Sequence, residues 1–297
     1  MSKPKKNIAP PENAYYWTNP DGTHGGLVAK SATIDPLAFI HPTATVGDGT
    51  VVGARAVISK GVRIGANVDI GDNVLLQRNV ILGNNVVIGE STSIGASSVI
   101  DNGVIIGADG VIGRCVEMRE GAALGESIQC ASNVFFGYKT TIRARSSIGE
   151  HTTIMENVVM GRSGIVGRGV VVDDGVNIAA GGHIGDNALI KKNVVLQDQV
   201  SVGSGSIIGT SSILGAHTTL GACVETGKNV GIGQSVVIEE YATIGDNTSI
   251  CDEVRLGKHA TLDQGVRIMV RTIVAAGAKI GAEVHIGDTS TPVPALY

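Results

Sequence analysis

Arginine side chains in residues 116–200 are the groups in this sequence best suited to chemistry. Arg143, Arg145 and Arg162 carry permanent positive charge on planar heads with several N–H donors, which match the oxygens of phosphate and carboxylate groups. His183 follows them and is the first candidate for proton transfer, because histidine titrates near neutral pH. We therefore expect an anion to bind near these arginines.

Histidine is sparse in this sequence, and its spacing bears on metal binding. His151, beside Glu150, is the second candidate after His183. A zinc site needs several ligands about 2 Å from the metal, yet the closest two histidines are 17 residues apart. We therefore expect no metal, and for any single histidine a surface turn residue remains the alternative. The seven are His24, His41, His151, His183, His217, His259 and His285.

A six-residue repeat runs through most of the chain and must position these side chains. Residues 201–236 divide into SVGSGS, IIGTSS, ILGAHT, TLGACV, ETGKNV and GIGQSV, in which the second residue is nearly always aliphatic and the third is Gly. Counting from Leu27 as the first slot, the register continues to Ser290 without an insertion, through about 44 sixes. A period of six is neither the two of a strand nor the 3.6 of a helix. It predicts short strands that alternate with turns.

This pattern resembles the hexapeptide-repeat family, whose chains form a left-handed parallel β-helix of triangular cross-section. The resemblance implies an all-β solenoid in which three sixes make one coil, so the chain would have somewhat under 15 coils. With strands about 4.8 Å apart, the rod would be roughly 70 Å long. About 20 sixes carry Asn or Gly in the fifth slot, where a left-handed turn conformation costs these residues least.

In such a rod, residues 18 apart stack on one another, and several charged residues then gather at one corner. Arg145, Arg162 and His183 come from successive coils and would form a cationic ladder there. Glu126 and Asp198 fall at the same corner. The alternative is a solvated corner whose ion pairs are each worth less than about 1 kcal/mol.

Opposite charges also stack on one face of the expected rod. Asp101 lies one coil from Arg119, and Asp173 lies one coil from Lys191. Such cross-strand pairs contribute about 0.2–1 kcal/mol each. We expect them to be structural.

The resemblance also implies an activity, since many hexapeptide-repeat proteins are acyltransferases that use acyl-CoA or acyl-carrier protein. It makes His183 or His151 the general base and leaves the three arginines to hold an anionic part of the donor, such as acetyl-CoA, or of a small acceptor. Members often carry a fourth-slot His and a loop extruded from the coil. In this chain the fourth slot never holds His, and no loop interrupts the register. A non-catalytic rod, serving as a scaffold or interaction module, is therefore the second hypothesis.

The first slot of each six points outward and is apolar over long stretches of two faces. Two such faces exceed what a monomer normally exposes to water, although β-propensity alone also favours Val and Ile in strands. We expect self-association, and the resemblance implies a homotrimer. One face includes Ile81, Val99, Phe135, Val171, Leu189 and Ile207, and the next includes Val87, Ile105, Val159, Val195 and Ile213.

Composition argues against several other classes of protein. The net charge of −4, with mixed signs and no basic stripe, makes nucleic acid an unexpected partner. No apolar run approaches the roughly 18 residues that cross a bilayer, and no apolar stretch follows the N-terminal lysines as in a secretory signal. The 4 cysteines have no paired spacing, which favours a cytoplasmic protein without disulfides.

The ends of the chain differ from its repeating part. Residues 1–26 hold Tyr15, Tyr16 and Trp17, aromatic side chains suited to covering the first coil. We predict an N-terminal capping segment over 1–26, a β-helix over 27–290 and a C-terminal tail over 291–297.

Overall fold

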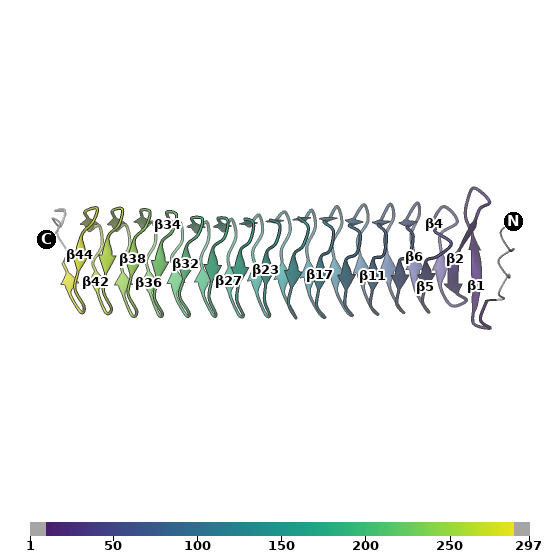
Figure 1. The fold of residues 1–297 in the computed structure, drawn as a ribbon, viewed down its shortest axis with the longest axis horizontal. Helices are drawn as coiled ribbons and strands as arrows, with labels where there is room; N and C mark the ends of the chain where they lie inside the picture. Colours follow the sequence, from purple (N-terminus) through teal and green to yellow (C-terminus); the bar gives the residue numbers. More distant parts are fainter. Residues whose placement is uncertain (1–9, 288–297) are drawn as a thin grey trace, which may run out of the picture.

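The computed structural model describes residues 10–287, and strands are the only regular secondary structure in that range. The chain forms a straight rod with β1 at one end (Figure 1). β1 spans Ala14–Thr18 and β2 spans His24–Ala29. The strands β3 to β45 have two residues each and begin every six residues, from Thr33–Ile34 to His285–Ile286. This spacing confirms the predicted all-β repeat.

Three sheets form the faces of the rod. Sheet A has 16 strands and runs from β1 to β44 (Lys279–Ile280), sheet B has 15 and runs from β3 to β45, and sheet C has 14 and runs from β4 (Phe39–Ile40) to β43 (Ile273–Val274). From β2 onward, consecutive strands enter successive sheets, so strands three apart in the chain pair in parallel. Stacking of residues 18 apart is thereby confirmed, and the fold is a left-handed β-helix of about 14 turns.

Fifth-slot residues turn the chain from one sheet to the next in a left-handed conformation. Asn67 and Asn73 have φ angles of 55° and 57°, which asparagine tolerates well. Side chains less suited to this region adopt it too, since Arg145 has φ of 61° and His151 has φ of 58°. The repeating backbone therefore imposes the turn even where the side chain disfavours it.

Second-slot side chains fill the interior of the rod. Met118, Cys130 and Phe136, where the aliphatic pattern lapses, are all buried. Buried sixth-slot hydroxyls donate to backbone carbonyls of the next coil, as Thr140 Oγ1 does to the Met155 oxygen at 2.8 Å. Within residues 10–287, no buried side-chain polar atom lacks a hydrogen-bond partner. The interior therefore accepts Ser and Thr without an unsatisfied polar group.

The first coil is covered by the segment that precedes it. β1 pairs antiparallel with β2 at the edge of sheet A, and Trp17 Nε1 donates to the Ala38 oxygen at 3.3 Å. The buried Asn19 accepts from the Ile40 N–H at 2.8 Å and donates to the Ile40 oxygen at 3.3 Å. Because Ile40 belongs to β4, these bonds give hydrogen-bond partners to backbone groups of the first strand of sheet C. On these contacts we propose that the segment before Leu27 caps the rod.

Other parts of the predicted domain division fall outside the structural description. Residues 1–9 and the tail over 291–297 lie beyond the described range, as does the predicted end of the repeat at Ser290.

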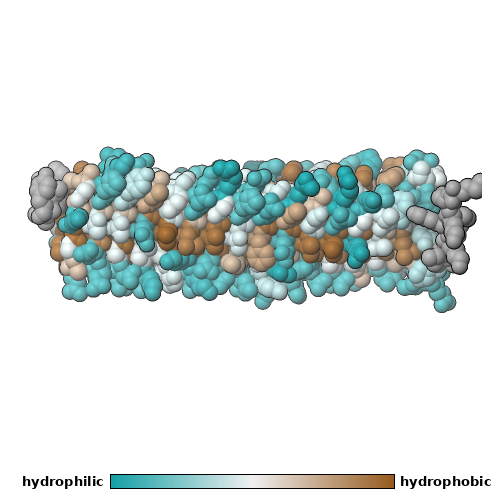
Figure 2. Space-filling model, in the orientation of Figure 1, coloured by the Kyte–Doolittle hydropathy of each residue, from teal (hydrophilic) through white to brown (hydrophobic). Residues whose placement is uncertain are grey.

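First-slot side chains point outward, as the repeat predicts, and many are apolar. Ile105 of β15 (Ile105–Ile106) is 50% exposed, and Ile165 of β25 (Ile165–Val166) is 49% exposed. Hydrophobic residues gather in a belt along the middle of the visible face, with hydrophilic residues along both edges (Figure 2). Residues 10–287 contain no helix that could cross a membrane.

Candidate functional site

Arg143 and Arg162 lie where sheet B turns toward sheet C. Arg143 directly follows β21 (Thr141–Ile142), and Arg162 lies two residues after β24 (Val159–Met160). β21 and β24 are paired neighbours, so the two side chains come from adjacent coils. Both line one open recess of about 430 Å³, together with Glu126.

A second recess of about 340 Å³ shares both arginines and extends to Asp198. The arginine pair thus stands between two hollows, each with one carboxylate. Neither Arg143 nor Arg162 forms an ion pair with any residue in 10–287. Their positive charge is therefore available to a ligand, while the carboxylates can accept hydrogen bonds from a hydroxyl or amine.

Arg145 takes part in the turn but not in either recess. Its backbone N–H donates to the Glu126 oxygen at 2.9 Å. Its side chain is exposed and is absent from the residues that line the two hollows. Of the three arginines predicted to bind an anion, the structure brings two together.

His183 begins β28 (His183–Ile184) on sheet C, directly after the turn whose Ala179 and Ala180 line the second recess. It is exposed, and its partners on neighbouring strands are Ile165 and Ser201. His183 therefore lies next to the arginine corner but beyond the recess lining.

The predicted cationic ladder of Arg145, Arg162 and His183 is wrong in its geometry. Backbone bonds at this corner join the Gly181 N–H to the Arg162 oxygen at 2.9 Å. Arg162 occupies a fourth slot, Arg145 a fifth slot and His183 a first slot, so the three belong to different rows of the rod. Residues 17 or 21 apart do not stack, because a coil contains 18.

His151 lies at a different edge, where sheet C turns toward sheet A. It is exposed in the turn, and its N–H donates to the Ser132 oxygen at 3.3 Å. The adjacent Glu150 lines a recess of about 430 Å³ that also includes Ser132 and Ser147. His151 is thus separated from the Arg143 and Arg162 pair by one whole face.

Of the two ion pairs predicted on sheet A, one forms as predicted and the other forms between neighbouring residues. Arg119 meets Asp101 at 3.4 Å, and it also meets Glu117 at 2.7 Å. The second ion pair joins Lys192 to Asp174 at 2.8 Å, one residue further along the chain than the predicted Asp173 and Lys191.

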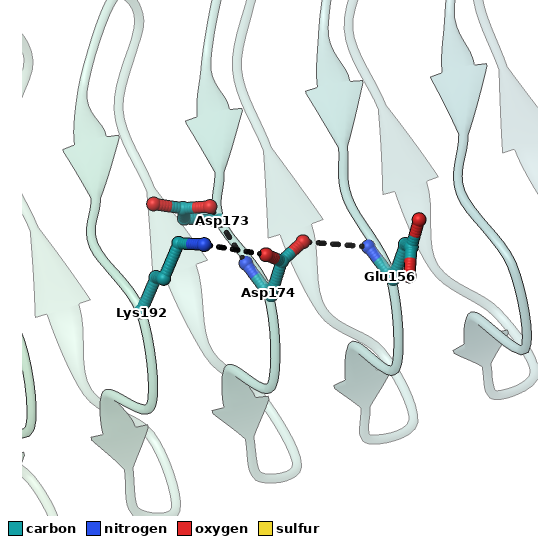
Figure 3. A network of polar contacts seen from close by, with 4 residues as sticks. All are labelled: Glu156, Asp173, Asp174 and Lys192. Atoms are coloured by element: carbon teal, nitrogen blue, oxygen red, sulfur yellow. Dashed lines mark hydrogen bonds and ion pairs between the residues drawn. The ribbon is translucent and has the colours of Figure 1, made fainter.

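Asp174 is the centre of that second network (Figure 3). Its carboxylate accepts from Lys192 Nζ at 2.8 Å and from the Glu156 N–H at 3.2 Å. Its own backbone N–H donates to Asp173 Oδ1 at 2.9 Å. The Lys192 hydrogen bond, chief among these contacts, lowers the pKa of Asp174. The network joins three coils along one edge, and we interpret its role as structural.

One further cationic recess was not predicted from the sequence. It has a volume of about 580 Å³ and is lined by Arg78 and Arg114. The available signal was that both occupy fourth slots 36 residues apart, which is two coils.

Within the described residues, no group of three or more His, Cys, Asp or Glu side chains is placed to hold a metal ion. The four cysteines are free thiols, with Cys130 buried and Cys115 and Cys223 exposed.

The fold thus defines a class of protein, the left-handed parallel β-helices built of hexapeptide repeats. The family model described as the GMPPB C-terminal domain matches residues 53–145. None of the curated proteins matches the sequence.

Several solved structures are similar to this chain. The UDP-N-acetylglucosamine acyltransferase of Francisella novicida is 20% identical with a TM-score of 0.28, over 64% of this chain and 67% of that chain. The Arabidopsis UDP-N-acetylglucosamine acyltransferase is 17% identical with a TM-score of 0.24, over 90% and 68% of the two chains. PerB from Caulobacter crescentus, solved with CoA and GDP-perosamine, is 18% identical with a TM-score of 0.17, over 48% and 51%. At these identities and TM-scores the likeness says nothing of a reaction or substrate.

Proposed function

We propose that this chain is an acyltransferase of the hexapeptide-repeat type, with its site at the edge between sheets B and C. The observation that carries the proposal is the pair of arginines, Arg143 and Arg162, which share two recesses and form no ion pair within residues 10–287. Two guanidinium groups side by side suit a phosphate or carboxylate group. The donor proposed is an acyl-CoA, whose phosphates they would hold.

His183 is the proposed general base, since it begins the strand that follows the turn at Ala180. It takes a proton from the acceptor hydroxyl or amine as that oxygen or nitrogen attacks the thioester carbonyl carbon. The carbon–sulfur bond then breaks, and the thiolate leaves with the proton that the imidazolium returns. Arg145, which lies outside the recess lining, would strengthen the positive field at this corner.

The site is open on a single chain, and we propose that a homotrimer encloses it. Exposed apolar first-slot residues, among them Val87 and Ile105 of sheet B, supply the surface for packing copies together. The free cysteines fit a reducing compartment, and we propose a cytoplasmic location.

Activity and ligand stabilisation test this proposal together. Acetyl-CoA at millimolar concentration should raise the melting temperature by a few degrees, because a ligand that binds only the folded chain stabilises it. Arg143→Gln and Arg162→Gln should each remove most of that shift, whereas Arg255→Gln, at the exposed first residue of strand β40 (Arg255–Leu256), should not. The absence of any shift with the unsubstituted chain would contradict the proposal.

The base is tested by transfer of a radiolabelled acetyl group to a panel of small hydroxyl and amine acceptors. His183→Asn should lower the transfer rate about 10²- to 10⁴-fold, the usual contribution of a general base. His217→Asn, an exposed turn residue on the same kind of coil, is the control. If His151→Asn lowers the transfer rate and His183→Asn does not, the general base is His151, at the other edge.

A non-catalytic rod is the second candidate function. The strands follow one another every six residues from β3 to β45, with no loop extruded between them. An unbroken rod suits a scaffold, whereas the acyltransferases that the repeat resembles often extrude a loop to enclose the acceptor. Ligand binding without transfer to any acceptor, and equal behaviour of His183→Asn and His151→Asn, would favour the rod.

A further inference from the structure

We propose a second anion site, at the edge where sheet C turns toward sheet A, that takes the diphosphate group of a small molecule. The recess there has a volume of about 580 Å³. Arg78 and Arg114 form its cationic lining, and Ser59, Gln77 and Ser97 are among its polar groups. The proposal is independent of the acyl-transfer site, which lies at another edge of the rod.

The repeating backbone places the two arginines in one row. The Ser97 N–H donates to the Arg78 oxygen at 2.9 Å, and the Cys115 N–H donates to the Ala96 oxygen at 3.0 Å. The fourth slots at this edge therefore stack in the order Lys60, Arg78, Ala96 and Arg114. With coils about 4.8 Å apart, the two arginine Cα atoms are separated by about 10 Å.

Ala96 leaves a space between the two arginines. A methyl group at this position is much shorter than the arginine side chains of the coils on either side, so both guanidinium groups can lean over it. The Ala96 N–H is already bonded to Gln77 Oε1 at 3.3 Å. The anion would therefore be held by side chains, with the hydroxyls of Ser59 and Ser97 as further donors.

The electrostatics favour an anion at this edge. The residues that line the recess include no Asp or Glu, in contrast to the hollows beside Arg143. Neither Arg78 nor Arg114 forms an ion pair with any residue in 10–287. Lys60, one coil before Arg78, adds a third positive charge to the row. The row of Lys60, Arg78 and Arg114 is thus locally positive in a chain whose net charge is −4.

Two linked phosphate groups match this arrangement better than one. Arg78 and Arg114 lie on the coils on either side of Ala96 and line the same recess, so each can bind the oxygens of its own phosphate group. A single phosphate would use one guanidinium fully and the other at longer range.

Calorimetric titration of the full chain with inorganic diphosphate tests the site. We expect binding that Arg78→Gln and Arg114→Gln each weaken about tenfold or more, since each substitution removes charge-assisted hydrogen bonds. Arg168→Gln is the matched control, because Arg168 occupies the same slot three coils beyond Arg114 but is engaged by Asp186 at 3.6 Å. Inorganic phosphate should bind more weakly than diphosphate.

A substitution that adds a group gives an independent test. Ala96→Glu places a carboxylate between the arginines, in a slot where this same edge already carries Glu150 and Glu240. We expect it to abolish diphosphate binding while the melting temperature is kept, so that loss of binding is not loss of folding.

Two results would overturn the proposal. One is unchanged diphosphate affinity in Arg78→Gln, Arg114→Gln and Ala96→Glu, and the other is an equal loss in Arg168→Gln, which would indicate general surface charge. Titration with ADP tests whether the diphosphate group belongs to a nucleotide or to a smaller molecule. Tighter binding of ADP than of diphosphate upholds the site with a nucleotide as ligand, and weaker binding upholds it with a smaller diphosphate.

Discussion

Cys130 occupies an inward slot that most other coils fill with an aliphatic residue, and the residue is 4% exposed. Burial, partly offset by a backbone hydrogen bond from Gly113, raises the pKa of the Cys130 thiol from 9.0 to about 12. In the unfolded chain the thiol regains its ordinary pKa. Between pH 9 and about 12 the unfolded state therefore releases a proton that the folded state keeps.

This difference predicts a pH-dependent loss of stability. Because the pKa of this thiol is higher in the folded state, the free energy of unfolding is unaffected below pH 9 and falls as the pH rises toward about 12. The fall is at most about 1.4 kcal/mol per pH unit. The melting temperature of the unsubstituted chain should fall more steeply above pH 9 than that of Cys130→Ala. Cys223→Ala, at an exposed thiol, should keep the original slope. Parallel slopes for all three chains would contradict the burial argument.

At the scale of the element, coils approach one another so closely that some positions admit no side chain. The Gly209 N–H, just after β32 (Ile207–Ile208), donates to Thr226 Oγ1 at 2.9 Å. Thr226 is the polar departure in the inward slot of β35 (Glu225–Thr226). A Cβ at Gly209 would overlap the backbone carbonyl of Gly227.

Gly209→Ala should therefore destabilise the rod by about 1–3 kcal/mol, the usual cost of overpacking. Gly231, which begins β36 (Gly231–Ile232), has open space where a Cβ would lie and serves as the matched control. Gly231→Ala should leave the melting temperature unchanged or raise it. Equal effects of the two substitutions, measured by thermal unfolding, would show that coil spacing is not limiting at Gly209.

At the scale of the whole molecule, apolar first slots extend along a rod that is open to solvent on three faces. Val87 and Ile105 are opposite one another on paired strands of sheet B and are 40% and 50% exposed. Contiguous apolar surface of this kind is usually covered in solution. The belt in Figure 2 runs along the same axis as the strands stack, which suits side-by-side packing of parallel rods.

Sedimentation velocity should accordingly detect a trimer of the unsubstituted chain. Ile105→Glu should shift it toward the monomer, because a buried carboxylate without a partner is costly at an interface. Ile273→Glu makes the same change at a 46% exposed residue of sheet C and tests whether the effect belongs to sheet B. A monomer at every concentration would contradict the proposed assembly.

The six-residue period by itself determined the fold of this protein. An aliphatic second slot, a small sixth slot and a turn-forming fifth slot specify the same local structure at every repeat, so local preference and global fold agree. The inward position of Cys130 and the contact of Arg119 with Asp101 followed from slot counting alone.

The placement of the candidate site was decided only by the tertiary structure. Arg143 and Arg162 share a recess, while Arg145 is directed elsewhere by its place in the turn. Slot counting locates a Cα but not the end of a long side chain, nor the hollow left by a short neighbour such as Ala96. The recess between Arg78 and Arg114 arises from that difference in side-chain length across adjacent coils, which only packing in three dimensions reveals.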